Sequence, residues 1–178
     1  MLSLVIGGAR GGKSRFALSL GASARRPLYL ATATAEDEEM VARIQRHRSE
    51  RDARWTTLEE SLEIGAAIER QTPEHDFILL DCLTLWLSNF AWTRRECSEQ
   101  QIHSAAIAEI ARVAAASAPS HVVLVTNEVG CGLVPESKVS RSFRDLQGWV
   151  NQEAARLADS VFLVTAGIAI PIKRPEAS

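Results

Sequence analysis

The sequence predicts an α/β protein in which helices cover both faces of a mostly parallel β-sheet. Short, continuous apolar runs alternate along the chain with helical patterns, as is typical of parallel strands that are buried on both faces. A glycine-rich segment joins the first apolar run to the first helical pattern. The 178 residues, 46% of them hydrophobic, suit a single domain over residues 1–178.

Five apolar runs are predicted to be strands because each is short, continuous and bounded by turn or helix signals. They cover residues 2–6 (LSLVI), 27–33 (PLYLATA), 77–81 (FILLD), 121–128 (HVVLVTNE) and 160–168 (SVFLVTAGI). The crossovers between them should be right-handed. Ligands of such sheets bind beyond the carboxyl ends of the strands, so the loops that follow the strands form the functional edge. The Gly- and Pro-rich stretch 128–137 lies on that edge.

The segments between the strands carry helical periodicity. The predicted helices cover residues 14–24, a segment after Thr34, and residues 59–71, 83–90, 98–117 and 139–159. Thr34 with Asp37 resembles an N-cap and its capping-box partner. In the same helix an acidic run precedes a basic run, an order that the helix dipole favours.

Composition excludes several classes of protein. The net charge of −2 gives no overall basic field, so we expect no nucleic-acid partner. The three cysteines are widely spaced without a CxxC pair, which indicates free thiols in a reducing compartment. No apolar run reaches the roughly 18 residues of a membrane span, and no signal peptide is evident. We therefore expect a cytoplasmic protein.

Residues 7–14, GGARGGKS, fit the phosphate-loop pattern G-x-x-x-x-G-K-[ST] between a predicted strand and a predicted helix. Glycines let the backbone N–H groups surround phosphate oxygens. Lys13 is expected to contact the β- and γ-phosphates, and Ser14 to bind Mg²⁺ through its hydroxyl. Asp81 ends an apolar strand, where a Walker-B carboxylate helps to hold the magnesium. It could also cap the helix that follows, and the two roles are compatible.

His47 lies among four arginines: Arg43, Arg46, Arg48 and Arg51. Nearby cations disfavour the protonated ring, and a neutral imidazole is a competent nucleophile toward phosphorus. The arginines could hold the phosphate oxygens of a nucleotide that the histidine attacks. The alternative from the residues alone is a solvated basic helix face. The other histidines, His75, His103 and His121, are expected to be structural.

The chain resembles the bifunctional adenosylcobinamide kinase / adenosylcobinamide-phosphate guanylyltransferase family of cobalamin biosynthesis. The resemblance covers nearly the whole chain. It rests on GGARGGKS, YLATATAEDEEMVARIQRHRSER, WTTLEE, LLDCLTLWLSN, VTNEVGCGLVPES, RSFRDLQGWVNQEAARLADSVFLV and GIAIPIK, of which RIQRHRSER and NEVGCGLVP are specific to the family. It implies a RecA-like P-loop NTPase fold and a homotrimer with sites near the subunit interfaces.

The resemblance also implies two reactions. An NTP, ATP or GTP, phosphorylates the aminopropanol arm of adenosylcobinamide, and GTP then transfers GMP to adenosylcobinamide phosphate through a guanylylated His47. The implied catalytic residues are His47 and Lys13, and the implied Mg²⁺ ligands are Ser14 and Asp81. The implied nucleotide-binding residues are Gly7, Gly8, Ala9, Arg10, Gly11, Gly12, Lys13, Ser14, Thr32, Ala33, Thr34, Arg48, Ser49, Glu50, Arg51, Glu59 and Asp81.

The family's phosphate loop usually has a serine where this chain has Gly11, which could alter nucleotide preference. Several roles stay open. Glu59 could instead be a first-turn charge on a helix. Asn127 and Glu128 could lie near the corrinoid or Mg²⁺, or organise their loop. Arg141 and Arg144 could meet a phosphate, although pairing with Glu136 and Asp145 at the surface is favoured.

Two other functions remain in competition with the bifunctional transferase. One is a small-molecule kinase that lacks the histidine step. The other is an NTP-responsive regulatory module that has lost catalysis, against which the intact Lys13, Ser14, Asp81 and His47 argue.

Overall fold

The computed structural model describes residues 1–33 and 51–174. The described strands form one seven-stranded sheet in the order β3-β2-β4-β5-β1-β6-β7. All neighbouring pairs are parallel except β6 and β7, which are antiparallel. The predicted mostly parallel sheet is confirmed.

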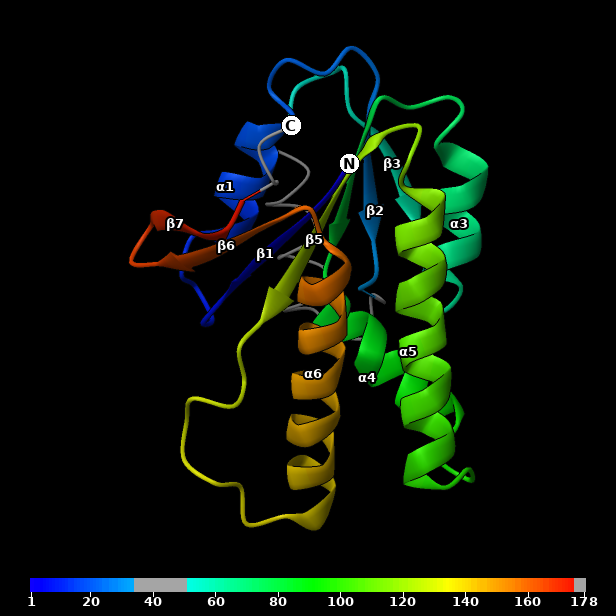
Figure 1. The fold of residues 1–178 in the computed structure, drawn as a ribbon, viewed down its shortest axis with the longest axis vertical. Helices are drawn as coiled ribbons and strands as arrows, with labels where there is room; N and C mark the ends of the chain where they lie inside the picture. The colour runs from blue at the N-terminus through cyan, green and yellow to red at the C-terminus, as the bar shows by residue number, and fades with distance from the viewer. Residues whose placement is uncertain (34–50, 175–178) are drawn as a thin grey trace.

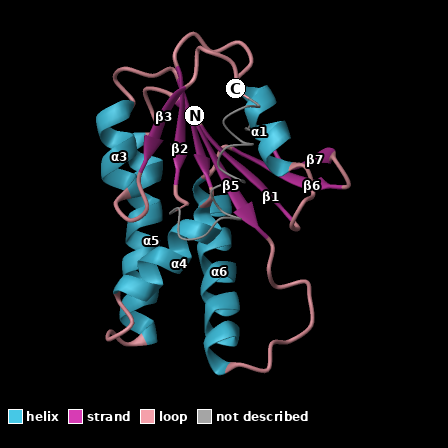
Figure 2. Ribbon diagram, turned by 180° about the vertical axis from the view of Figure 1, so that it is seen from behind, coloured by secondary structure: helices cyan, strands magenta, loops and turns pink. Residues whose placement is uncertain are grey.

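The strands are β1 Leu2–Gly7, β2 Pro27–Ala31, β3 Thr56–Glu59, β4 Phe77–Asp81, β5 His121–Asn127, β6 Ser160–Thr165 and β7 Ile168–Lys173. The helices are α1 Lys13–Leu20, α3 Ile64–Gln71, α4 Leu83–Thr93, α5 Glu99–Ala116 and α6 Lys138–Leu157. Helices α3 to α6 cover one face of the sheet and α1 covers the other (Figures 1 and 2).

The two faces of the sheet bury two separate apolar clusters. Consecutive residues of the central strands belong to opposite clusters: Leu4 lies in the larger one under α3 to α6, and Val5 in the smaller one with α1. Both side chains are fully buried. This is why the strand patterns are continuously apolar, as the sequence indicates.

Strand β3 was not predicted, and the predicted helix over residues 59–71 begins only at Ile64. The four residues of β3 include one apolar side chain, Leu58, and the other three are exposed. An edge strand of this composition has no apolar run to identify it. Before α3, the Glu60 carboxylate accepts hydrogen bonds from the main-chain N–H groups of Leu62 and Glu63, which forms a turn.

The predicted last strand, residues 160–168, is instead the first half of a hairpin. Strand β6 ends at Thr165, and β7 returns antiparallel to it. The two turn residues, Ala166 and Gly167, both have positive φ, 50° and 80°. Positive φ at both central residues is the geometry that two-residue hairpins favour. Ala-Gly is a weaker signal for such a turn than Asn-Gly, so the apolar pattern alone does not indicate a break at these two residues.

The helix boundaries follow local capping. Helix α5 begins with a capping box, in which the Ser98 hydroxyl accepts from the Gln101 N–H and the Gln101 side chain accepts from the Ser98 N–H. Helix α1 ends at Leu20, before the predicted residue 24, with Gly21 as its C-cap. In the described part of the chain, no helix is long and apolar enough to cross a membrane. Cys97 and Cys131 are exposed thiols, and Cys82 is buried.

We expect His121 to make folding stability fall in mild acid. At the start of β5 its Nε2 lies 2.8 Å from the Ser3 Oγ. Burial, and after it the charge of the Met1 amino group, lowers the pKa of His121 below its ordinary 6.5, while Asp159 acts in the opposite direction. The unfolded chain therefore binds the proton more readily. The stabilisation is complete above about pH 6.5 and is lost as the pH falls through the lower folded-state pKa.

The comparison that isolates this effect is urea unfolding of the wild type and His121→Gln on either side of about pH 6.5. The wild type should lose more unfolding free energy on acidification than the variant, whose amide does not titrate. Parallel losses in the two proteins would mean that other groups cause the acid sensitivity.

Candidate active site

The predicted phosphate loop connects β1 to α1 at the carboxyl edge of the sheet. The N–H of Gly11 donates to the Gly8 carbonyl at 3.2 Å, and Gly12 precedes the first residue of α1. Two loop residues have positive φ: Arg10 at 56° and Gly12 at 97°. This backbone leads directly into a helix N-terminus, a combination suited to anions.

The loop packs so closely against β6 that side chains do not fit at its root. A Cβ on Gly7 would lie 2.1 Å from the Val164 carbonyl oxygen. A Cβ on Gly11 would lie 3.0 Å from the Gly8 oxygen and 3.1 Å from the Val164 oxygen. The position at which the family usually has serine is therefore tightly packed against main-chain oxygens in this chain.

The turn of the β6–β7 hairpin supports the loop from behind. The Gly167 N–H donates to the Gly11 carbonyl at 2.9 Å. A Cβ on Gly12 would lie 3.1 Å from the Cα of Gly167, so two glycines meet where the loop and the turn touch. Both have positive φ. The loop is thus held in shape by main-chain contacts from a hairpin whose second strand, β7, the sequence did not reveal.

Lys13 is buried within this loop, with 8% of its surface exposed. Its Nζ donates to the Gly8 carbonyl at 2.7 Å, so the ammonium group lies over the loop. A buried cation at the N-terminus of a helix strengthens the attraction of the loop for phosphate.

The metal-binding pair predicted from the sequence, Ser14 and Asp81, comes together. The Ser14 hydroxyl donates to the Asp81 Oδ2 at 2.8 Å, across residues far apart in the chain. A hydroxyl and a carboxylate are the hard oxygen donors that Mg²⁺ prefers, and Mg²⁺ typically takes one or two protein carboxylates together with substrate phosphates. The two residues therefore fit the cation that a phosphate-loop enzyme uses with NTP.

Asp81 does not cap the following helix. The N-cap of α4 is Cys82, and no side chain caps that helix end. Asp81 instead accepts a second hydrogen bond, from the Tyr29 hydroxyl at 3.0 Å. The hydrogen bonds from Ser14 and Tyr29 thus hold the Asp81 carboxylate beside the phosphate loop.

Tyr29 is a site residue that sequence reasoning missed. Burial, and secondarily the Asp81 carboxylate, raises the pKa of its hydroxyl far above the ordinary value, so the group stays protonated and donates. The Arg51 guanidinium lies over the Tyr29 ring, 3.9 Å from its centroid, and also donates to the Thr57 hydroxyl at 3.0 Å. The Tyr29 side chain thus contacts Asp81 through its hydroxyl and Arg51, at the end of the arginine-rich segment, through its ring.

A family model described as cobinamide kinase / cobinamide phosphate guanyltransferase matches residues 3–172. The chain belongs to this family. Membership gives it both activities, cobinamide kinase and cobinamide phosphate guanylyltransferase, and confirms the predicted family.

Three curated relatives of the family cover 97% of this chain. The bifunctional adenosylcobalamin biosynthesis protein CobU of Salmonella typhimurium is 44% identical and that of Escherichia coli 41% identical, each covered over its whole length. The corresponding protein CobP of Pseudomonas aeruginosa is 38% identical over 98% of its length.

Among solved structures, an ATPase from the type III secretion system of pathogenic bacteria aligns with a TM-score of 0.61 at 10% identity. The alignment covers 96% of this chain and 56% of the ATPase chain. At this identity the likeness shows the fold alone. With the parallel sheet and the phosphate loop, it confirms the predicted RecA-like P-loop NTPase fold.

Thr32 and Ala33, two of the remaining positions implied to bind the nucleotide, lie just after the end of β2. The Thr32 hydroxyl is buried and bonded to the main chain of Cys82, donating to its carbonyl at 2.7 Å and accepting from its N–H at 2.8 Å. The Thr32 carbonyl accepts from Asn89 at 3.0 Å. These bonds fix the end of β2 beside β4, and Ala33 follows as the next partly exposed residue.

Glu59 is the last residue of β3 and is exposed, so the alternative that it is a first-turn helix charge is wrong. Because β3 lies beside β2, Glu59 is in register with Ala31 at the carboxyl edge. Its predicted role toward the nucleotide stays a prediction. The residues Thr34, His47, Arg48, Ser49 and Glu50 lie outside the described residues, as do Arg43 and Arg46.

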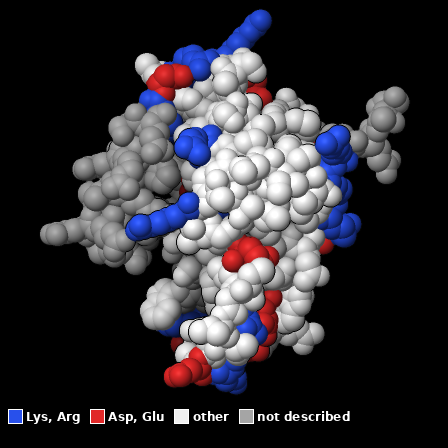
Figure 3. Space-filling view, turned by 90° about the vertical axis from the view of Figure 1, so that its left-hand side faces the viewer, with Lys and Arg blue, Asp and Glu red and all other residues white. Residues whose placement is uncertain are grey.

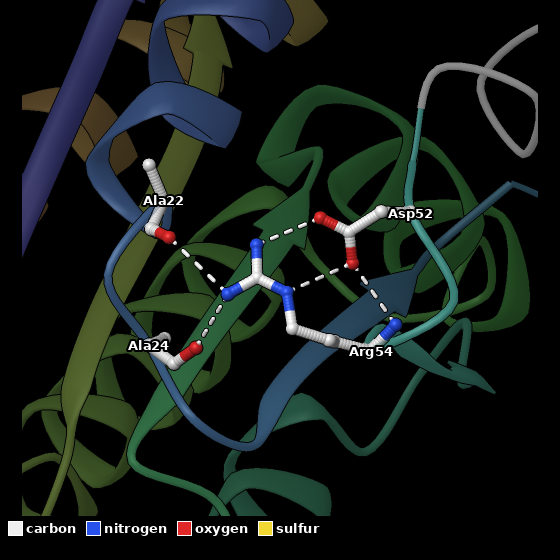
Figure 4. Close-up of polar contacts among 4 residues, drawn as sticks. All are labelled: Ala22, Ala24, Asp52 and Arg54. Carbon is white, nitrogen blue, oxygen red and sulfur yellow. Dashed lines mark hydrogen bonds and ion pairs between the residues drawn. The ribbon is translucent and has the colours of Figure 1, made fainter.

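The chain immediately after residue 50 is anchored by Arg54 (Figure 4). Its guanidinium donates to the carbonyls of Ala22 and Ala24 at 3.2 and 2.9 Å, and its Nε donates to the Asp52 carboxylate at 3.1 Å. The Arg54 hydrogen bonds lower the pKa of Asp52. The approach to β3 is thus tied to the connection between α1 and β2.

Asn127, the last residue of β5, and Glu128, which follows it, lie beside the phosphate loop at the carboxyl edge of the sheet. The Glu128 N–H donates to the Gly7 carbonyl at 3.1 Å, and the Asn127 N–H donates to the Thr84 hydroxyl at 3.0 Å. The Glu128 carboxylate accepts from the Gly130 N–H at 2.8 Å. This pattern favours loop organisation among the alternatives left open.

Arg144 pairs with Asp145 at 3.4 Å, in agreement with the surface interpretation. Arg141 donates to the main-chain carbonyls of Pro135 and Glu136 at 2.9 and 2.6 Å, rather than to the Glu136 carboxylate. Arg141 therefore fastens the end of the loop to α6.

The three other histidines have structural contacts, as predicted. His75 Nδ1 lies 3.2 Å from the Gln71 carbonyl, and the His103 ring packs on Trp149 with ring centroids 4.7 Å apart. His121 contacts Ser3.

Proposed function

We propose that the chain uses an NTP to phosphorylate the aminopropanol hydroxyl of adenosylcobinamide and then transfers GMP from GTP to that phosphate, both within one domain. The single observation that carries the proposal is the convergence of Lys13, Ser14 and Asp81 around the phosphate loop in a member of this family. Adenosylcobinamide phosphate is then the product of the first reaction and the acceptor of the second.

In the kinase step, the loop N–H groups and the helix N-terminus would bind the triphosphate, while Lys13 would stabilise charge on the transferring phosphoryl group. Ser14 and Asp81 would hold Mg²⁺, which neutralises charge on the phosphate oxygens when bound. The substrate hydroxyl would attack the γ-phosphorus in line and lose its proton to solvent, as the bond from the γ-phosphorus to the β-phosphate oxygen breaks and the nucleoside diphosphate is released. ATP and GTP both fit this chemistry.

In the guanylyl transfer step, a neutral imidazole of His47 would attack the α-phosphorus of GTP. A nitrogen–phosphorus bond forms as the bond to the β-phosphate oxygen breaks, and pyrophosphate leaves. The cobinamide phosphate oxygen then attacks the same phosphorus, which releases the histidine and gives adenosyl-GDP-cobinamide. The support is the sequence around His47, where the arginines favour an uncharged ring and can bind the triphosphate.

The deciding experiment is incubation of the protein with Mg²⁺ and GTP labelled at the α-phosphate, followed by a denaturing gel and intact-mass analysis. We expect an acid-labile adduct of one GMP in the wild type and in His75→Ala, and none in His47→Ala. His75 is a matched control because its contact to the Gln71 carbonyl is structural.

An adduct that survives in His47→Ala would place the nucleophile elsewhere. GTP binding without any adduct, but with phosphorylation of cobinamide, would favour the plain kinase. GTP binding with neither product would favour the regulatory module.

We also propose that the chain assembles as a homotrimer in the cytoplasm. Strand β7 lies at the edge of the described sheet and exposes Ile168, Ile170 and Ile172. Ile168 and Ile170, two positions apart in the regular part of the ladder, share one face, and Ile172 lies at a register shift beyond them. Figure 3 shows an area without charged side chains at the centre of this side of the molecule, bordered by Lys, Arg, Asp and Glu. An apolar edge strand of this kind supports association. Sedimentation equilibrium tests it, and a monomer at micromolar concentration would contradict it.

A further inference from the structure

Tyr29 is the only tyrosine of the chain, and it contacts two groups that lie far from it in the sequence. It occupies β2, with 5% of its surface exposed. Its hydroxyl donates to the Asp81 Oδ2 at 3.0 Å, and its ring lies under the Arg51 guanidinium at 3.9 Å. The two ends of one side chain therefore face the two parts of the site that the proposed reactions require.

The hydroxyl end fixes the carboxylate. Asp81 Oδ2 accepts from both Ser14 and Tyr29, at 2.8 and 3.0 Å. Ser14 is itself expected to bind the metal, whereas Tyr29 donates to Asp81 from β2, the strand beside β4, as an outer partner of the carboxylate. Hydrogen bonds from such outer partners orient a metal-binding carboxylate.

The ring end fixes the plane of a guanidinium. Arg51 is held between the Tyr29 ring and the Thr57 hydroxyl, to which it donates at 3.0 Å. Stacking on an aromatic face orients the planar fork with which arginine recognises phosphate oxygens. Strand β2, which carries Tyr29, lies between β3 with Thr57 and β4 with Asp81, so rigid elements hold all three groups.

We propose that Tyr29 is a positioning residue for both nucleotide reactions: its hydroxyl orients Asp81 for the metal and its ring orients Arg51 for the triphosphate. The inference rests on the proposed function, because it assigns the metal to Asp81 and the nucleotide to Arg51. The inference adds that one side chain, Tyr29, positions both the residue that binds the metal and the residue that binds the triphosphate.

Two substitutions separate the two ends of Tyr29. Tyr29→Phe removes only the hydroxyl and keeps the ring under Arg51. Tyr29→Leu removes both. Phe162→Leu is the matched control, because Phe162 packs against the same apolar cluster as Tyr29, while its ring contact is an edge-on one with Phe16.

The first readout is metal binding without turnover. Mn²⁺ is titrated in the presence of a non-hydrolysable GTP analogue and followed by electron paramagnetic resonance. Both Tyr29→Phe and Tyr29→Leu should weaken Mn²⁺ binding by on the order of tenfold, as the loss of an outer-shell partner does. Phe162→Leu should match the wild type.

The second readout is the GTP concentration that gives half-maximal adduct formation at saturating Mg²⁺. Tyr29→Leu should raise it by about tenfold because the cation–π contact is lost, while Tyr29→Phe should leave it within about twofold of the wild type. This split separates positioning from general loss of stability, which would affect Phe162→Leu as well.

Wild-type Mn²⁺ binding in Tyr29→Phe would overturn the hydroxyl role. Equal GTP dependence in Tyr29→Leu and Phe162→Leu would overturn the ring role. If the wild type forms no adduct, the proposed guanylyl transfer fails, and GTP-analogue affinity at saturating Mn²⁺ replaces the second readout with the same expected split.

Discussion

Replacement of Lys13 by alanine is expected to slow both phosphoryl transfer and guanylylation by on the order of 10³. The lysine ammonium group lies over the phosphate loop, 2.7 Å from the Gly8 carbonyl, with 8% of the residue exposed. In such a site a cation stabilises developing phosphate charge far more than it would in water. Steady-state kinase assays and single-turnover adduct formation measure the two losses.

The fold should survive this substitution, because Gly8 is exposed and water can replace the lost donor at its carbonyl. Arg70→Ala, which removes an exposed charge at the end of α3, is the control and should keep full activity. If Lys13→Ala retained the adduct rate and lost only kinase activity, the two reactions would not share the phosphate loop.

The largest expected effect on stability is that of Trp86→Ala, which should lower the free energy of unfolding by about 4 kcal/mol. Trp86 is fully buried in α4 and belongs to the larger cluster. Its ring packs on Phe90 with centroids 5.0 Å apart, and its Nε1 donates to the Leu62 carbonyl at 2.9 Å. The substitution opens a cavity and leaves the carbonyl without this donor.

Trp92→Ala is the matched control on the same helix, because Trp92 is 70% exposed. It should change the unfolding free energy by no more than about 0.5 kcal/mol. Guanidinium unfolding followed by circular dichroism compares the two variants with the wild type. Similar losses in both would contradict the assignment of Trp86 to the core.

The parts of the fold that the sequence predicts well are those with local signals. The strands β1, β4 and β5 appear as apolar runs because both of their faces are buried. The phosphate loop is predictable because its glycines, Lys13 and Ser14 are consecutive. The pairing of Ser14 with Asp81 follows from the parallel arrangement, which brings the strand ends to one edge.

The parts that were missed depend on partners distant in the sequence. Strand β3 exists because β2 offers it an edge, and its own residues are mostly polar or exposed. Strand β7 follows a turn in which Ala166 has positive φ, a conformation that alanine does not favour and that its presence in the sequence does not predict. Tyr29 appeared as one more apolar strand residue, since only the fold brings Asp81 and Arg51 to it.

The support of the phosphate loop by the β6–β7 turn has a consequence for nucleotide affinity. The Gly7 root lies against β6 and the Gly11 carbonyl accepts from Gly167, so the loop backbone is ordered as part of the folded chain. A loop that must be ordered by its ligand lowers affinity by the entropy lost on binding. Here that entropy is lost when the protein folds, which leaves the phosphate contacts free to contribute fully to nucleotide binding.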